Sequence, residues 1–190
     1  MKGAPIVCGG VLVPKEEFSN QCFIHDFSRN EWRFLSNMTG RRGRAFTSSV
    51  VPDDALWITG QRKTTEFIYP SGKVVQGPNL PSEVSGHCMV KLHDGKIMIL
   101  GGDKYHDDDT QVLIYDPKSN YSLSKGPPLL YATFTAACTV FNSPMHNGRP
   151  VILVTGGFNR YNASQPGSFN PIFTSQIFDY THRDSWEIGE

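Results

Sequence analysis

The stretch Ile99-Leu100-Gly101-Gly102 (ILGG) decides the fold, because related stretches recur along the chain. Apolar runs that end in a glycine doublet also occur at Gly9-Gly10 (IVCGG) and at Gly156-Gly157 (LVTGG). A damaged copy, WITGQ, carries Gly60 followed by Gln61. The copies follow one another at intervals of about 40–55 residues, which indicates a repeated supersecondary unit rather than a single irregular domain.

Each glycine copy is followed by a second short strand and a polar turn. These strands read CFIHD, EFIYP, VLIYD and QIFDY, and three of them contain an aspartate, at Asp26, Asp116 and Asp179. Trp32 and Trp186 follow in the first and last copies. Glycine permits positive φ where the chain leaves a sheet, and the aromatic residues are expected to wedge between neighbouring sheets.

The doublets, the aromatic–Asp pairs and the following Trp resemble kelch repeats over nearly the whole chain. The resemblance implies an all-β, kelch-type β-propeller with four blades of mostly four antiparallel strands, in a single region over residues 1–190. The blade limits are 1–37, 38–81, 82–130 and 131–190. Blade one begins at its second strand, APIVCGG, so we expect an incomplete ring that further blades, a partner or self-association would close.

The bulk composition favours a turn-rich β protein without a strongly charged surface. Only 19% of residues are charged, and 18 basic residues balance 18 acidic ones. This balance argues against nucleic acid as a partner, and no apolar run is long enough to insert in a membrane. The histidines are dispersed and the cysteines lack CxxC spacing, so no metal or other cofactor is expected.

The four cysteines leave the cellular compartment open. Cys8 and Cys22 lie on strands expected to be neighbours, so they form either a disulfide or two buried thiols. Cys88 and Cys138 are expected to be separate core thiols. NxS/T sequons at Asn37, Asn120 and Asn162 are a weak hint of secretion, and the lean is towards an extracellular protein, with the cytoplasm as the alternative.

The resemblance to kelch domains implies that partners bind through two loops of each blade. One is the loop after the glycine doublet, and the other is the loop that leads into the next inner strand. The arginines of SNMTGRRGR form either a cationic clamp or, as we favour, a solvated turn with one Arg bracing the next blade. The acidic loop DKYHDDDTQ is a partner surface or a solvated loop. The long loop FNRYNASQPGSFNPIFTS has the composition of a contact site. The candidate contact residues are Arg41, Arg42, Arg44, Tyr105, His106, Asp107, Phe158, Arg160, Tyr161 and Phe169.

Two functions of different classes follow from the resemblance. One is a non-catalytic scaffold that binds a protein or peptide of unknown identity; the other is part of an enzyme similar to the galactose and glyoxal oxidases. The segment LYATFTAACTV contains Tyr131 and Cys138 but no tyrosine at the position resembling the crosslinked one of the oxidases. Neither HxH nor GxSxG occurs, so we expect no enzyme activity and no catalytic residues.

Overall fold

The computed structural model describes residues 4–43, 48–50, 54–103, 110–119, 122–160, 169–182 and 185–189. These residues form antiparallel β-sheets and one short 3-10 helix, η2 (Pro144–His146), so the fold is all-β as the sequence predicts. The chain divides into two compact units, Met1–Glu83 and Val84–Glu190, each of which is described by itself. No helix among the described residues is long and apolar enough to span a bilayer.

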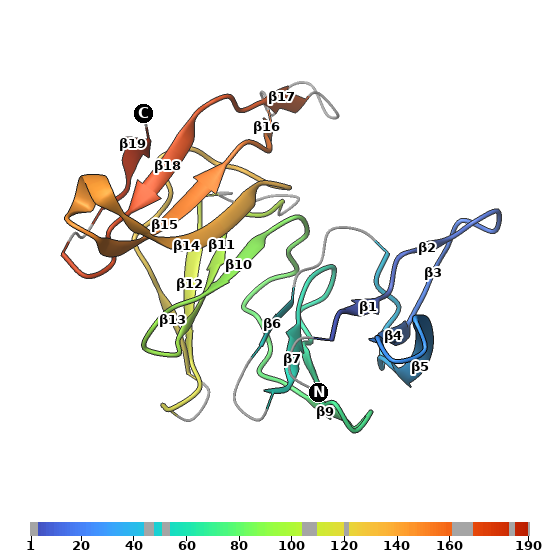
Figure 1. Ribbon diagram of the computed structural model, residues 1–190. Coiled ribbons are helices and arrows are strands. Elements are labelled where there is room, and N and C mark those ends of the chain that lie inside the picture. The colour runs from blue at the N-terminus through green and yellow to red at the C-terminus, as the bar shows by residue number, and fades with distance from the viewer. Residues whose placement is uncertain are drawn as a thin grey trace. The chain divides into compact units, whose positions relative to one another are not determined.

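Sheet 1, in the first unit, has three strands in the order β1-β4-β5. Its strands are β1 (Ile6–Cys8), β4 (Gln21–Asp26) and β5 (Glu31–Asn37), drawn in blue in Figure 1. Between β1 and β4, a small hairpin pairs β2 (Val11–Leu12) with β3 (Glu17–Phe18). A three-stranded sheet is what the sequence predicts for a repeat that begins at its second strand.

The other three principal sheets each have four antiparallel strands. Sheet 2, in the first unit, contains β6 (Ser48–Val50), β7 (Leu56–Ile58), β8 (Glu66–Ile68) and β9 (Val74–Gln76). Sheet 3, in the second unit, contains β10 (Cys88–Lys91), β11 (Ile97–Leu100), β12 (Val112–Asp116) and β13 (Ser122–Lys125). Sheet 4 contains β14 (Ala137–Ser143), β15 (Arg149–Thr155), β18 (Ser175–Phe178) and β19 (Glu187–Gly189).

The long loop of the last repeat is not wholly without structure of its own. Within it, β16 (Phe158–Arg160) pairs with β17 (Phe169–Pro171), and this hairpin lies along the chain between β15 and β18, which pair directly in sheet 4 (Figure 1). The loop, for which the sequence predicts no strands, therefore contains a short antiparallel ladder.

The glycine doublets end the second strand of each repeat at a point where one loop reaches the next. Gly101 and Gly102 have φ of 62° and 101°, which a residue with a Cβ rarely adopts. The amide of Gly102 donates to the carbonyl of Thr133 (2.8 Å), and that of Gly10 donates to the carbonyl of Arg42 (2.9 Å). The doublet therefore lets the backbone of one repeat approach the loop that leads into the next.

Gln61 replaces the second glycine in sheet 2 and still takes the left-handed conformation, with φ of 60°. Its Oε1 accepts a hydrogen bond from the amide of Gly43 at 2.6 Å. The damaged copy thus keeps the turn of the glycine doublet, and its side chain gains a partner that glycine cannot have.

Each unit has a hydrophobic core between two sheets. In the first unit Cys22 of sheet 1 and Met38 pack with Ile58 and Ile68 of sheet 2. In the second unit the larger core joins sheets 3 and 4: Val90, Leu92, Met98, Leu100, Val112, Leu129, Ile152, Val154, Phe178 and Trp186. The expected wedge holds for Trp186, which is 4% exposed, but not for Trp32, which is 50% exposed.

Candidate interaction surface

Arg42 lies in the loop after β5, inside the junction between sheets 1 and 2. Its backbone amide donates to Ser19 (3.0 Å), which fixes the loop beside the glycine doublet of sheet 1. Its guanidinium donates to the carbonyls of Gly60 and Thr64 and contacts Glu66 Oε1 at 3.2 Å. The side chain of Arg42 is fully buried. Its three side-chain hydrogen bonds hold the loop after sheet 1 to sheet 2.

The burial of Arg42 corrects its assignment as a partner-contact residue and agrees with the alternative of an arginine that braces the neighbouring sheet. Removal from water lowers the pKa of Arg42, while the adjacent Glu66 carboxylate acts in the opposite direction and favours the charged form. Arg41 differs, because its side chain is 62% exposed and makes only a surface ion pair with Glu17 (3.5 Å). Arg44 lies outside the described residues.

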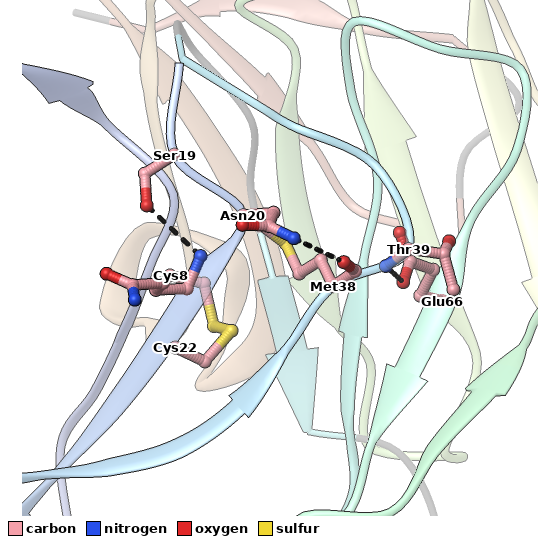
Figure 2. Close-up of a disulfide and its surroundings, with 8 residues drawn as sticks. Cys8, Ser19, Asn20, Cys22, Met38, Thr39 and Glu66 are labelled. Atoms are coloured by element: carbon pink, nitrogen blue, oxygen red, sulfur yellow. Dashed lines mark hydrogen bonds between the residues drawn. A yellow bond between two sulfur atoms is a disulfide. The ribbon is translucent and has the colours of Figure 1, made fainter. Parts of the chain in front are cut away.

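Glu66 holds a position that the sequence analysis missed. In Figure 2 the backbone amide of Thr39 donates to Glu66 Oε2 (2.6 Å), and the side-chain Nδ2 of Asn20 donates to the carbonyl of Met38 (3.1 Å). Gln176 is its counterpart on β18, where it accepts from the amide of Tyr131 (3.0 Å) and donates to the Tyr131 carbonyl (3.1 Å). A polar residue among the apolar positions of EFIYP and QIFDY was the available signal.

In the second unit the two predicted kinds of contact loop do lie together. The amide of Phe134, in the loop leading into β14, donates to the carbonyl of Phe158 (2.9 Å), and the reverse bond measures 3.0 Å. Their rings lie 6.0 Å apart. Phe158 is 42% exposed, and the nearby Tyr131 is 39% exposed, so this pair of loops presents aromatic surface to solvent.

Phe173 is a further exposed aromatic residue that was not among the sequence candidates. The amide of Ile172 donates to the carbonyl of Gly157 (2.9 Å), which returns the chain to the glycine doublet just before Phe173. Its ring is 92% exposed. Arg160 and Phe169 pair in the hairpin backbone, whereas Tyr161 and the acidic-loop candidates Tyr105, His106 and Asp107 lie outside the described residues.

All four cysteines are joined in disulfides. Cys8 and Cys22 face each other across β1 and β4, and Figure 2 shows their disulfide. Their Cα atoms are 4.1 Å apart. Cys88 and Cys138 join the first strands of sheets 3 and 4, with Cα atoms 6.1 Å apart. This second bridge corrects the expectation of two separate core thiols, because the first strands of sheets 3 and 4 are close enough to be cross-linked.

A cavity of 550 Å³ lies within the second unit, with an apolar floor that includes Met98, Ile114 and Phe178. Its polar edge carries Asp94 and Lys96, which form an exposed ion pair of 3.0 Å. No three His, Cys, Asp or Glu side chains gather within the described ranges in a way that could hold a metal ion.

Comparisons with known proteins place the fold but not a family. No protein-family profile matches the chain, and no curated protein matches it. The chain is similar to a solved structure described as "Structure of YjhT", with 14% sequence identity and a TM-score of 0.79. The match covers 98% of this chain and 67% of the YjhT chain, so the two share an all-β fold of repeated antiparallel sheets.

Proposed function

We propose that this chain is a kelch-type β-propeller region that binds a protein or peptide without catalysis, through loops on one rim of its blades. The glycine-doublet repeat supports the kelch assignment, as do the successive antiparallel sheets and the likeness in fold to YjhT. In a repeat fold of this kind the sheets form the scaffold, and binding specificity depends on residues of the connecting loops.

The observation that carries the binding proposal is the aromatic surface built by two loops of sheet 4. Phe158 and Tyr131 are each partly exposed beside the Phe134–Phe158 backbone bridge, and Phe173 projects almost fully into solvent. Aromatic residues on a preformed backbone bury a large area on binding and lose little conformational freedom, which is why they dominate binding hot spots.

The test is selection of a random peptide library displayed on phage against the intact chain. We expect enriched peptides whose affinity falls at least about tenfold in a Phe158→Ala/Phe173→Ala variant, which corresponds to the loss of at least one hot-spot contact. The matched control is Phe27→Ala, because Phe27 is an exposed aromatic residue (67%) of the first unit.

Two results would contradict the proposal. One is that no peptide sequence is enriched over selection on the empty support. The other is an equal loss of affinity in the Phe27→Ala control. A Phe173→Ala single variant separates binding from folding, since removing a side chain that is 92% exposed should leave the melting temperature unchanged.

We further propose that the protein resides in an oxidising, extracellular compartment. The pairing of Cys8 with Cys22 and of Cys88 with Cys138 supports this, because such bridges do not persist in the reducing cytosol. Counting thiols on the denatured, unreduced protein from its native source tests the proposal: we expect none, and four reactive thiols would refute it.

A further inference from the structure

One face of sheet 1 presents apolar side chains to solvent. Val7, Trp32 and Phe34 are 53%, 50% and 55% exposed. They lie on the same face as Phe23, whose ring packs edge-on against Phe34 (6.0 Å), and as His25, whose ring packs edge-on against Trp32 (5.2 Å). We call these five residues the Trp32 face. A connected apolar patch of this kind on a soluble protein marks an interaction site.

Sheet 4 shows what covers the same face elsewhere in the molecule. Asp26 and Asp179 begin equivalent turns, since each accepts from the amide two residues later (3.0 and 3.1 Å). The residues before and after them therefore correspond: His25 with Phe178, and Trp32 with Trp186.

The sheet 4 counterpart is covered by sheet 3 and the segment that follows it. The rings of Phe178 and Trp186 stack at 5.2 Å and belong to a core that includes Leu129 and aliphatic residues of sheet 3. The indole Nε1 of Trp186 donates to the carbonyl of Pro127 (3.0 Å). The occupant of such a face is thus an aliphatic sheet surface followed by a backbone carbonyl that can accept from the tryptophan.

We propose that the Trp32 face docks a second copy of this chain, through the face of that copy's sheet 4 that points away from sheet 3. Thr139, Leu153 and Ile177 are directly opposed across β14, β15 and β18, on the side away from the core with sheet 3. Phe141 lies on the same side and is 38% exposed. The docking repeats, between two molecules, the arrangement in which sheet 3 covers sheet 4 within one molecule.

The charges favour this pairing. None of the five residues of the Trp32 face is an Asp, Glu, Lys or Arg residue, whereas the sheet 4 face carries the carboxylate of Glu187 opposite Ile177. Glu187 Oε1 already lies 2.6 Å from His146 Nε2 of its own chain, so docking leaves no carboxylate there without a partner, and the net charge of zero adds no repulsion between copies. The contact joins two different surfaces and is thus heterologous. This inference does not rest on the proposed function of the rim loops.

Sedimentation velocity over a range of chain concentrations, combined with iodide quenching of tryptophan fluorescence, tests the docking. Trp57 and Trp186 are 0% and 4% exposed, so quenching in the free chain reports mainly on Trp32. We expect the mean mass to rise with concentration while the quenching falls in parallel. A chain that stays monomeric would overturn the proposal, whether Trp32 is quenched throughout or shielded throughout.

A complementation experiment tests which surfaces meet. Phe34→Asp removes the Trp32 face and Phe141→Asp removes the sheet 4 face, so neither variant alone should self-associate. Mixed in equal amounts, they should form a 1:1 dimer, because one intact contact remains. Self-association of Phe141→Asp alone would show that the Trp32 face meets itself and would overturn the proposal.

The same experiment needs a control for nonspecific effects of a new charge and for folding. Met145→Asp adds a charge at a side chain that is 76% exposed and should associate like the unmodified chain. If an Asp variant unfolds, Phe34→Ser and Phe141→Ser take its place with the same expected outcomes. Loss of association in Met145→Asp as well would overturn the assignment of the contact to these two faces.

Discussion

Sheets 1 and 4 carry the same sequence motif on the same face, yet only one of these faces is buried. Trp186 stacks on Phe178 inside a core and donates to a carbonyl, whereas Trp32 packs edge-on against His25 at the surface. The aromatic–Asp–Trp motif therefore specifies how a strand turns and where its aromatic residues project. Burial depends on whether another sheet lies against that face.

The junctions between sheets show a second contrast. Between sheets 1 and 2, the ionised pair Arg42–Glu66 is buried, while between sheets 3 and 4 the neutral amide of Gln176 pairs with the backbone of Tyr131. The side chains of Glu66 and Gln176 each accept a hydrogen bond from the loop that leads into their own sheet. The same position of the repeat can therefore stabilise a junction between two sheets either with a buried ion pair or with a neutral amide.

The largest expected difference between the two regions is in the cost of removing the tryptophans. Trp186→Ala should destabilise the chain by about 3–5 kcal/mol, because it leaves a cavity and an unpaired Pro127 carbonyl. Trp32→Ala should cost less than about 1 kcal/mol, since half of its surface is already in water. Urea unfolding of dilute protein, followed by circular dichroism, measures both. Equal costs would mean that the Trp32 face is buried in the free chain.

The loss of unfolding free energy on removing a polar side chain should differ by about 2 kcal/mol between the two junctions. Arg42→Leu leaves the Glu66 carboxylate buried without a cation, at a cost of about 3 kcal/mol, and the Arg42→Leu/Glu66→Leu double variant should recover part of it. Gln176→Leu removes a neutral partner and should cost about 1 kcal/mol. Urea unfolding of the unmodified chain and of the variants Arg42→Leu, Glu66→Leu, Arg42→Leu/Glu66→Leu and Gln176→Leu gives these values, and additive effects of Arg42→Leu and Glu66→Leu would disprove the coupling.

The two disulfides should differ by about 1 kcal/mol. The Cys88–Cys138 bridge spans 50 residues of sequence and the Cys8–Cys22 bridge spans 14, and the entropy lost by the unfolded chain grows with the closed loop. In the chain-entropy description, their contributions are about 4 and about 3 kcal/mol. Replacing each pair by serine and comparing the urea midpoints measures the difference. A larger effect at Cys8–Cys22 would show that native packing outweighs loop length.

The smallest difference concerns acid sensitivity. Hydrogen bonds from Ser28 lower the pKa of the partly buried Asp26. Burial alone would raise the pKa of Asp179, but bonds from Thr181 and the charge of Arg149 outweigh it and lower the pKa. Each carboxylate therefore stabilises the fold above its ordinary pKa, and this contribution disappears as the pH falls through the lowered value.

We expect Asp179→Asn to cost no more than about 1 kcal/mol at neutral pH and to reduce the acid dependence of stability. Asp26→Asn should have a smaller effect, because Asp26 is more exposed and its partner Arg33 is half in water. Thermal midpoints measured from neutral to acidic pH compare the two variants. A larger acid effect at Asp26→Asn would contradict the ranking.

The repeat was readable from the sequence because Gly101-Gly102 and its copies mark places where the backbone itself must approach another loop. Such positions tolerate few residue types other than glycine, so they can be recognised from the sequence alone. The three strands of sheet 1 were also predictable from the sequence, because the first repeat begins at its second strand. The β16–β17 hairpin did not, since a short ladder within a loop rich in Gly, Pro and Ser has little periodicity to detect.

The candidate site was less predictable. Arg42 was correctly placed in a loop, but whether an arginine in a loop points to solvent or into a junction depends on tertiary packing, here on Gly60, Thr64 and Glu66. The exposure of Phe173 and Trp32 depends in the same way on what lies beside them. Sequence patterns specify which residues share a strand, whereas side-chain environment arises from segments far away in the chain.

The Cys88–Cys138 bridge gives the molecule an uneven response to mechanical force. If the chain is pulled from its ends, tension passes directly through the bond between β10 and β14, and the residues between the two cysteines carry no load. That segment would otherwise extend by about 170 Å, taking about 3.4 Å for each residue. In an oxidising environment, sheet 3 is thus shielded from stretching, and adding a reductant would lengthen the extensible chain by one repeat.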